Sequence, residues 1–117
     1  MSKRYFIGLD NGGSVTKAGL FDQNGSEVVV SSRLAQPITP RVGFVERDSN
    51  QLFDANAACI REVIEKSGVD PADVKAISVA GHGNGLYLVG YDGKPSYNGI
   101  ISTDTRSAEI VKRMYED

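Results

Sequence analysis

The alternation of apolar and polar positions in the first 35 residues predicts a three-stranded antiparallel sheet. Residues 5–9 form a short apolar run, residues 15–21 alternate loosely, and residues 27–34 are rich in valine. Turn-forming residues at 10–13 and 22–25 separate the three runs. We therefore expect three consecutive strands that pair in meander order.

The middle of the chain predicts a loop and then a helix. Residues 36–47 contain two prolines and few periodic apolar positions, which favours an irregular loop that is too polar for the core. Capping side chains at 48–50 then precede apolar residues at helical spacing, and Gly68 ends the pattern. Residues 70–73 have the composition of a brief capped turn.

The last third of the chain predicts a strand, a hairpin and a helix. Residues 74–80 are an apolar run of strand length, for which we expect a buried fourth strand. Two short apolar segments within 86–101 flank a turn and suggest a further hairpin. Thr103 or Asp104 is expected to cap a terminal helix that runs through Met114.

A meander, a helix and another strand are the element order of a ribonuclease-H-like α/β domain. In that fold helices cover a mixed sheet. A chain of 117 residues provides one such domain but not two lobes that enclose a cleft.

Composition narrows the function classes. Apolar residues make up 40% of the chain and charged residues 24%, as in globular proteins that fold in water. The net charge of −2 and the scattered Lys and Arg argue against nucleic acid as a partner. No apolar run has the length of a signal peptide or a membrane span, and Cys59 is the only cysteine. We expect a cytoplasmic protein in which Cys59 is a small buried apolar residue.

The turn after the first predicted strand carries groups that suit a phosphate. Two glycines after an acidic residue let the backbone bend sharply and direct its amides toward an anion. Hydroxyls and a lysine can add donors, and a carboxylate can face a hydrated Mg²⁺. An ordinary hairpin explains the same residues equally well on spacing alone. The candidate nucleotide-binding residues are Asp10, Gly12, Gly13, Ser14, Thr16 and Lys17, with Asp10 also the candidate metal ligand.

Four blocks of sequence, in order, resemble the FGGY family of carbohydrate kinases. They are YFIGLDNGGS with AGLFD in residues 5–22, GFVERD in 43–48, VKAISVAGHGNG in 74–85, and the segment from DGKP to DTR in 92–106. Four collinear blocks arise by chance far less readily than any one of them. The resemblance implies an actin-like ATPase fold of the ribonuclease-H-like class, with this chain as an incomplete N-terminal lobe, residues 1–117.

The resemblance also implies an ATP-dependent phosphotransferase that uses Mg²⁺. It makes Asp10 the carboxylate near the metal and the γ-phosphate, with Gly12, Ser14 and Lys17 around the phosphates. Many relatives have two hydroxyl residues where this chain has Gly13 and Ser14, and arginine where it has Lys17. Phosphate contacts are therefore expected to differ in detail.

The same resemblance implies a sugar pocket. The polar groups of the turn after the fourth strand suit a polyol. A tryptophan of the family is replaced by Ser102, which, with the glycine-rich turn, resembles the branch that acts on L-xylulose. Without the family, an exposed loop imidazole, a helix cap and a surface charge remain the simpler interpretations. The candidate substrate-binding residues are His82, Gly83, Asn84, Asp104 and Arg106.

The family's general base and second phosphate loop are expected downstream of residue 117, so we expect the isolated chain to lack sugar kinase activity. A metal-dependent nuclease of the same fold would need several carboxylates, of which only Asp10 is well placed. A non-catalytic interaction module is the third hypothesis. Apolar surface that the missing lobe would otherwise cover should favour self-association of this chain.

Overall fold

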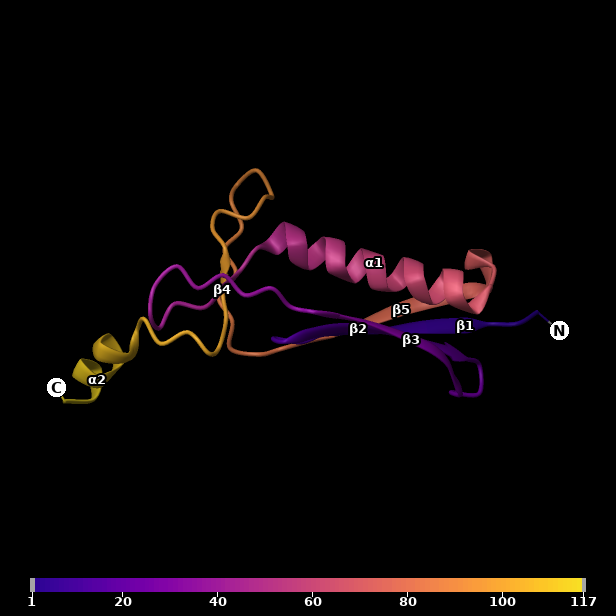
Figure 1. Ribbon diagram of the computed structural model, residues 1–117, viewed down its shortest axis with the longest axis horizontal. Helices are drawn as coiled ribbons and strands as arrows, with labels where there is room; N and C mark the ends of the chain where they lie inside the picture. The colour runs from indigo at the N-terminus through magenta and orange to yellow at the C-terminus, as the bar shows by residue number, and fades with distance from the viewer. Residues whose placement is uncertain (1, 117) are drawn as a thin grey trace. The chain divides into compact units, whose positions relative to one another are not determined.

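The structure is a computed structural model that describes residues 2–116 (Figure 1). The described residues form two compact units. The first comprises the chain as far as Ala35 together with Asn50–His82. The second comprises Gln36–Ser49 together with the chain from Gly83 onward.

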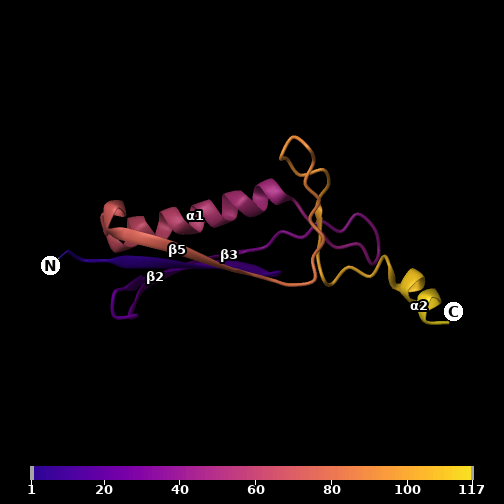
Figure 2. The ribbon, with the colours of Figure 1, turned by 180° about the vertical axis from the view of Figure 1, so that it is seen from behind.

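The first unit is a four-stranded mixed sheet with one helix on it (Figure 1). Its strand order is β3-β2-β1-β5, and β1 pairs antiparallel with β2 and parallel with β5. Figure 2 shows β5 running beside β1. The predicted mixed sheet is thus confirmed. The strands are β1 (Tyr5–Asn11), β2 (Val15–Asp22), β3 (Glu27–Leu34) and β5 (Val74–Gly81).

Helix α1 (Ser49–Ser67) confirms the helix predicted from the apolar spacing. It ends where Gly68 takes a φ of 67°, a left-handed conformation that glycine adopts without steric cost. A short 3-10 helix, η1 (Pro71–Asp73), follows, and the Asp70 side chain accepts a hydrogen bond of 2.9 Å from the Ala72 amide. This side chain caps the turn that leads into β5.

The core lies between α1 and the two central strands. Alternate residues of β1 and β2 point toward the helix, as the two-residue period of a strand requires. Cys59 is fully buried there, as predicted. The buried core side chains are Ile7, Leu9, Ala18, Leu20, Cys59 and Val63.

The opposite face of the sheet carries an aromatic ring above two glycines. A Cβ atom placed on Gly8 would lie 3.7 Å from the Phe21 ring, and one on Gly19 would lie 2.8 Å from it. Position 8 thus has room for a methyl group, whereas position 19 does not while Phe21 keeps its place.

Strand β5 is not buried as the sequence predicted. Ile77 and Val79 pair in register with the core residues Ile7 and Leu9, yet they are 50% and 63% exposed. The reason is position, because β5 is the edge strand of the sheet and α1 packs on the central strands. An apolar run reports what a strand can bury, and not what covers it.

The second unit contains a two-stranded sheet of β4 (Glu46–Arg47) and β6 (Gly99–Ile100). The prediction that 36–47 lies outside any core is wrong at its end, where Glu46 and Arg47 are 2% and 4% exposed. The hairpin predicted within 86–101 forms two isolated bridges, Leu86 to Ile100 and Val89 to Pro95.

Helix α2 (Ala108–Glu116) begins later than predicted. Neither Thr103 nor Asp104 caps it, because the Asp104 carboxylate binds Val45 and Arg106 instead. Within residues 2–116, no helix is both long and apolar enough to cross a membrane.

We predict that Leu20→Ala destabilises the chain, since the Leu20 side chain is fully buried between α1 and the sheet. The free energy of unfolding should fall by about 2–5 kcal/mol in urea titrations. Leu34→Ala is the matched control at a position 76% exposed, where the change should stay within about 0.5 kcal/mol. Equal losses at the two positions would contradict this placement of the core.

Candidate functional site

The turn of residues 12–14 joins β1 to β2 among the candidate phosphate-binding residues, and we call it the phosphate turn. Asp10 and Lys17 are direct cross-strand partners, so their side chains lie side by side on one face of the sheet. Both side chains are exposed, and they lie on the face opposite α1, because the neighbouring Leu9 and Ala18 point into the core. The turn thus presents a carboxylate and an ammonium group together.

The backbone of this turn needs glycine at its first position. A Cβ atom on Gly12 would lie 2.7 Å from the Val15 carbonyl oxygen, which accepts a 3.0 Å hydrogen bond from the Gly12 amide. The Gly12 amide therefore closes the turn. Within residues 2–116, the Gly13 and Ser14 amides make no hydrogen bond, and a Cβ on Gly13 would meet open space. These two amides are the ones that the turn can offer to an anion.

Thr16 does not lie with these groups. It pairs with Asn11 on the helix-covered face and is 1% exposed. Its hydroxyl oxygen has no hydrogen-bond partner among the described residues. The prediction that Thr16 donates to a phosphate therefore does not fit this geometry, because alternation along β2 sends its side chain away from Lys17.

The one carboxylate beside the turn, Asp10, suits a nucleotide-bound cation better than a dedicated metal site. Among the described residues, no three His, Cys, Asp or Glu side chains gather to hold a metal ion. Mg²⁺ in phosphotransferases typically keeps several waters and binds one or two carboxylates plus phosphate oxygens. A single exposed carboxylate at Asp10 fits that role.

The turn after β5 lies at the same edge of the sheet. β1 and β5 are parallel, so both turns leave their carboxyl ends, and Asn11 pairs with Gly81. The His82 amide donates a 3.1 Å hydrogen bond to the Asn11 carbonyl, and His82 Nδ1 lies 3.3 Å from the same oxygen. That oxygen can only accept, so the Nδ1 contact requires a protonated Nδ1. His82 thus adjoins the phosphate turn.

Asn11 lies directly before the phosphate turn, and Asn84 lies in the segment that follows β5. The Asn11 side-chain oxygen accepts a 3.3 Å hydrogen bond from Asn56 on α1, which ties the phosphate turn to the helix. In the second unit, Asn84 has a φ of 60°, a left-handed conformation in which non-glycine residues are uncommon. Gly83 precedes it and is exposed.

The Asp104 carboxylate is held by hydrogen bonds from Val45 and Arg106. Its side chain is 3% exposed and accepts hydrogen bonds from the Val45 amide at 2.6 Å and from Arg106 Nη2 at 2.7 Å. Arg106 Nε and the Arg106 amide each lie 2.9 Å from the second carboxylate oxygen. The carboxylate therefore has donors on both of its oxygens.

Glu46 completes this ionic cluster. Its carboxylate is 2% exposed and lies 2.7 Å from Arg106 Nη2. Tyr97 and Asn98 donate further hydrogen bonds to it at 3.0 and 3.2 Å. The Arg106 guanidinium also lies 4.0 Å from the centre of the Phe44 ring, a cation–π distance.

The cluster shifts the pKa of each of its members. The Arg106 side-chain hydrogen bond lowers the pKa of Asp104 well below its ordinary range, and it also lowers the pKa of Glu46. Asp104, and then Glu46, raise the pKa of Arg106 in turn. All three groups are therefore charged at neutral pH.

The sequence alone assigns Glu46 no role, yet its carboxylate lies at the centre of this cluster. Its nearest cation, Arg106, is 60 positions away. A single sequence carries no signal for such a pairing, because surface and buried glutamates look alike in it. The GFVERD block was the only pointer to the position.

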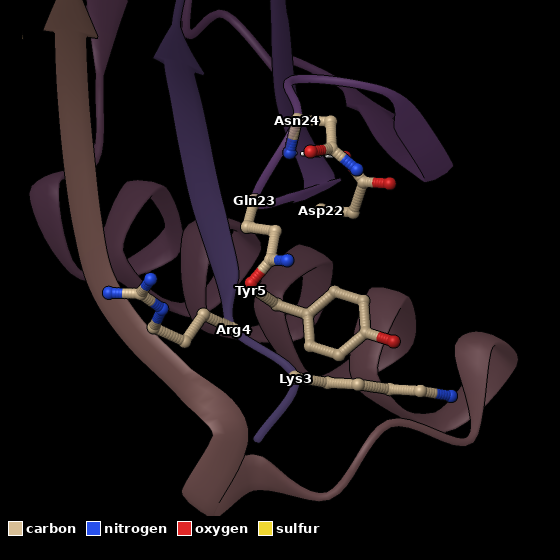
Figure 3. A pocket seen from close by; sticks show the side chains of 6 residues that line it. All are labelled: Lys3, Arg4, Tyr5, Asp22, Gln23 and Asn24. Atoms are coloured by element: carbon tan, nitrogen blue, oxygen red, sulfur yellow. Dashed lines mark hydrogen bonds between the residues drawn. The ribbon is translucent and has the colours of Figure 1, made fainter. Parts of the chain in front are cut away.

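A shallow hollow of about 200 Å³ lies far along the sheet from these turns (Figure 3). It surrounds the start of β1 and the end of β2, where Tyr5 pairs with Asp22. In Figure 3, Lys3 and Arg4 extend in different directions, and the Asn24 amide donates to Asp22. Because β1 and β2 are antiparallel, this hollow is at the end of the sheet opposite the phosphate turn.

We predict that the cluster makes the fold acid-sensitive. Asp104 and Glu46 have folded pKa values below their ordinary 3.8 and 4.5, so they contribute stability above those values and lose it as the pH falls toward the folded values. Urea titrations should show the free energy of unfolding falling between about pH 5 and pH 2. Arg106→Met should flatten that fall. Glu62, whose pKa is also lowered, titrates in both proteins and contributes equally to both pH slopes. An unchanged slope in Arg106→Met would therefore contradict the ion pairing.

Known proteins resemble this chain over nearly all of its length. The L-xylulose/3-keto-L-gulonate kinase of Escherichia coli (strain K12) is 40% identical over 114 residues, which cover 97% of this chain and 23% of that protein. The probable L-xylulose kinase of Pasteurella multocida (strain Pm70) is 37% identical, with 96% and 23% covered. The chain thus spans less than a quarter of these relatives.

Solved structures agree with the sequence relatives. The gluconate kinase from Lactobacillus acidophilus superposes with a TM-score of 0.91 at 31% identity, over 98% of this chain and 23% of that one. The ligand-bound xylulose kinase from the same organism gives 0.89 at 31% identity, over 97% and 22%. These neighbours confirm the predicted fold class.

The model of the FGGY family of carbohydrate kinases, N-terminal domain, matches residues 5–117. That match includes the phosphate turn, the turn after β5 and the ionic cluster. The chain therefore belongs to the FGGY family of carbohydrate kinases, in the region of its N-terminal domain.

Proposed function

We propose that the protein carrying this chain is an ATP-dependent sugar kinase. It transfers the γ-phosphate of ATP to a hydroxyl of a ketopentose or a related sugar, and L-xylulose is the first substrate to test. The family match supports this proposal, as does the similarity to the L-xylulose/3-keto-L-gulonate kinase of Escherichia coli and the probable L-xylulose kinase of Pasteurella multocida.

The observation that carries the proposal is that His82, the first residue after β5, lies against the phosphate turn at one edge of the sheet. The His82 amide bonds the Asn11 carbonyl, so the turn after β5 begins within hydrogen-bond distance of the phosphate turn. In this proposal the phosphoryl donor binds at the phosphate turn and the hydroxyl acceptor binds beside His82, so that transfer is direct.

Four residues in and beside the phosphate turn have roles in this proposal. The Gly13 and Ser14 amides and the Ser14 hydroxyl donate to phosphate oxygens, and Lys17 balances their negative charge. Asp10 orients the cation that accompanies the nucleotide. Mg²⁺, when bound, neutralises charge that builds up on the transferred phosphoryl group.

A nuclease of the same fold finds no support here. Two-metal nucleases gather several carboxylates around the ions, and no such group exists within residues 2–116. A non-catalytic interaction module would be distinguished by an activity assay, because a protein of that kind would show no sugar-dependent ATP turnover.

We predict that Asp10→Asn and Lys17→Met each lower kcat of the full-length protein by about 100-fold or more, since both remove charge that faces the transferred phosphoryl group. A coupled assay of sugar-dependent ADP release measures this. Thr16→Val is the control on the same strand, because its side chain points into the core. Full activity in the Asp10 and Lys17 variants would contradict the assigned phosphate turn.

We also predict that residues 1–117 alone show no sugar-dependent ATP turnover, because the family's general base is expected downstream of this segment. The full-length gene product, assayed in parallel with L-xylulose and other ketopentoses, should turn over. Turnover by the short chain above its sugar-free background would show that these residues contain a complete catalytic site.

A further inference from the structure

We propose that Arg106 and Asp104, together with Glu46, do not bind the sugar but position the turn that does. This inference rests on the proposed function, because it concerns how the sugar turn, residues 83–85 after β5, is held. It replaces the direct contact expected of Asp104 and Arg106 with an indirect role, and it gives Glu46 a role that the sequence did not suggest.

Asp104 has little hydrogen-bonding capacity left. Its 3% exposed carboxylate accepts from the Val45 amide, the Arg106 amide and two nitrogens of the Arg106 side chain. A carboxylate offers about four lone-pair sites. A sugar hydroxyl could donate to Asp104 only by displacing one of these donors.

Arg106 is held by contacts on several sides of its guanidinium. Its Nε and Nη2 atoms bond the two carboxylates, and its plane lies over the Phe44 ring. The side chain is 22% exposed. A guanidinium fixed by two anions and an aromatic face is a rigid structural element rather than an adaptable ligand.

The β4–β6 sheet connects the cluster to the sugar turn inside the second unit. Glu46 pairs with Ile100 in the β4–β6 sheet. Ile100 in turn exchanges two hydrogen bonds with Leu86, at 2.8 and 2.9 Å. Leu86 is two residues beyond Asn84, which holds the unusual φ of 60°. Asparagine adopts this left-handed conformation more readily than other non-glycine residues, so Asn84 forms a sharp bend whose position depends on the Leu86–Ile100 hydrogen bonds that follow it.

A second set of contacts clamps the same two segments. The Ile101 amide donates to the Val45 carbonyl at 3.2 Å, and the Thr105 amide donates to the Gly43 carbonyl at 2.8 Å. Removing one partner of a buried ion pair leaves an uncompensated charge that forces neighbouring groups to move. Loss of Glu46 or Arg106 should therefore disturb Asn84 through Ile100 and Leu86.

The test uses the full-length protein and three variants, Glu46→Gln, Arg106→Lys and the double variant. We expect each single change to raise the KM for the sugar by about tenfold and to leave the KM for ATP within about twofold. The double variant should resemble the single ones, because the residues act as one unit. Glu62→Gln and Arg33→Lys, which alter an exposed ion pair in the first unit, are the matched controls.

Deoxy analogues of the sugar separate positioning from direct contact. If the cluster only positions the turn, Arg106→Lys raises the KM for the sugar and for each analogue by the same factor. If Arg106 bonds one hydroxyl, the variant loses its discrimination against the analogue that lacks it, which would overturn the proposal. An unchanged sugar KM in Glu46→Gln would overturn it as well.

Tyr97→Phe keeps the experiment informative if the charge variants fail to fold, because it removes only one hydrogen bond to Glu46. It should raise the sugar KM in the same direction by a smaller factor, and an unchanged KM would count against the proposal. A wild-type protein that phosphorylates no sugar would defeat the proposed function instead. Amide hydrogen exchange at Val45, Leu86 and Ile100 then still decides, since faster exchange in Tyr97→Phe supports the network and unchanged exchange refutes it.

Discussion

The central strand β1 determines most of what this chain can do. It pairs antiparallel with β2 through a tight turn and parallel with β5 through a crossover that contains α1. The antiparallel pairing places Asp10 beside Lys17. The parallel pairing brings the end of β5 to Asn11, at the carboxyl edge where binding turns of α/β sheets gather.

The sequence predicted those elements whose signals are local. The boundaries of β2, β3 and α1 agree with the structure to within one or two residues, because turn residues and Gly68 stop them. Signals that depend on distant partners were misread. β5 has the apolar composition of a buried strand but is an edge strand, and Asp104 caps no helix because its oxygens already bind Arg106.

The candidate site divides in the same way. Asp10, Gly12 and Lys17 could be named as candidates from one short segment and from the family resemblance. Thr16 lies on the other face, because successive side chains of a strand point to opposite faces of the sheet and the sequence does not show at which residue β2 begins. Glu46 needed a partner 60 residues away, and only the folded chain shows that pairing.

The aromatic ring above Gly8 and Gly19 constrains how this sheet can change over evolutionary time. A methyl group at position 19 would come within 2.8 Å of Phe21, whereas one at position 8 would stay 3.7 Å away. Larger residues at position 19 thus require a smaller or displaced neighbour at position 21. Homologues should therefore vary these two positions as a pair, while position 8 drifts between glycine and alanine independently of them.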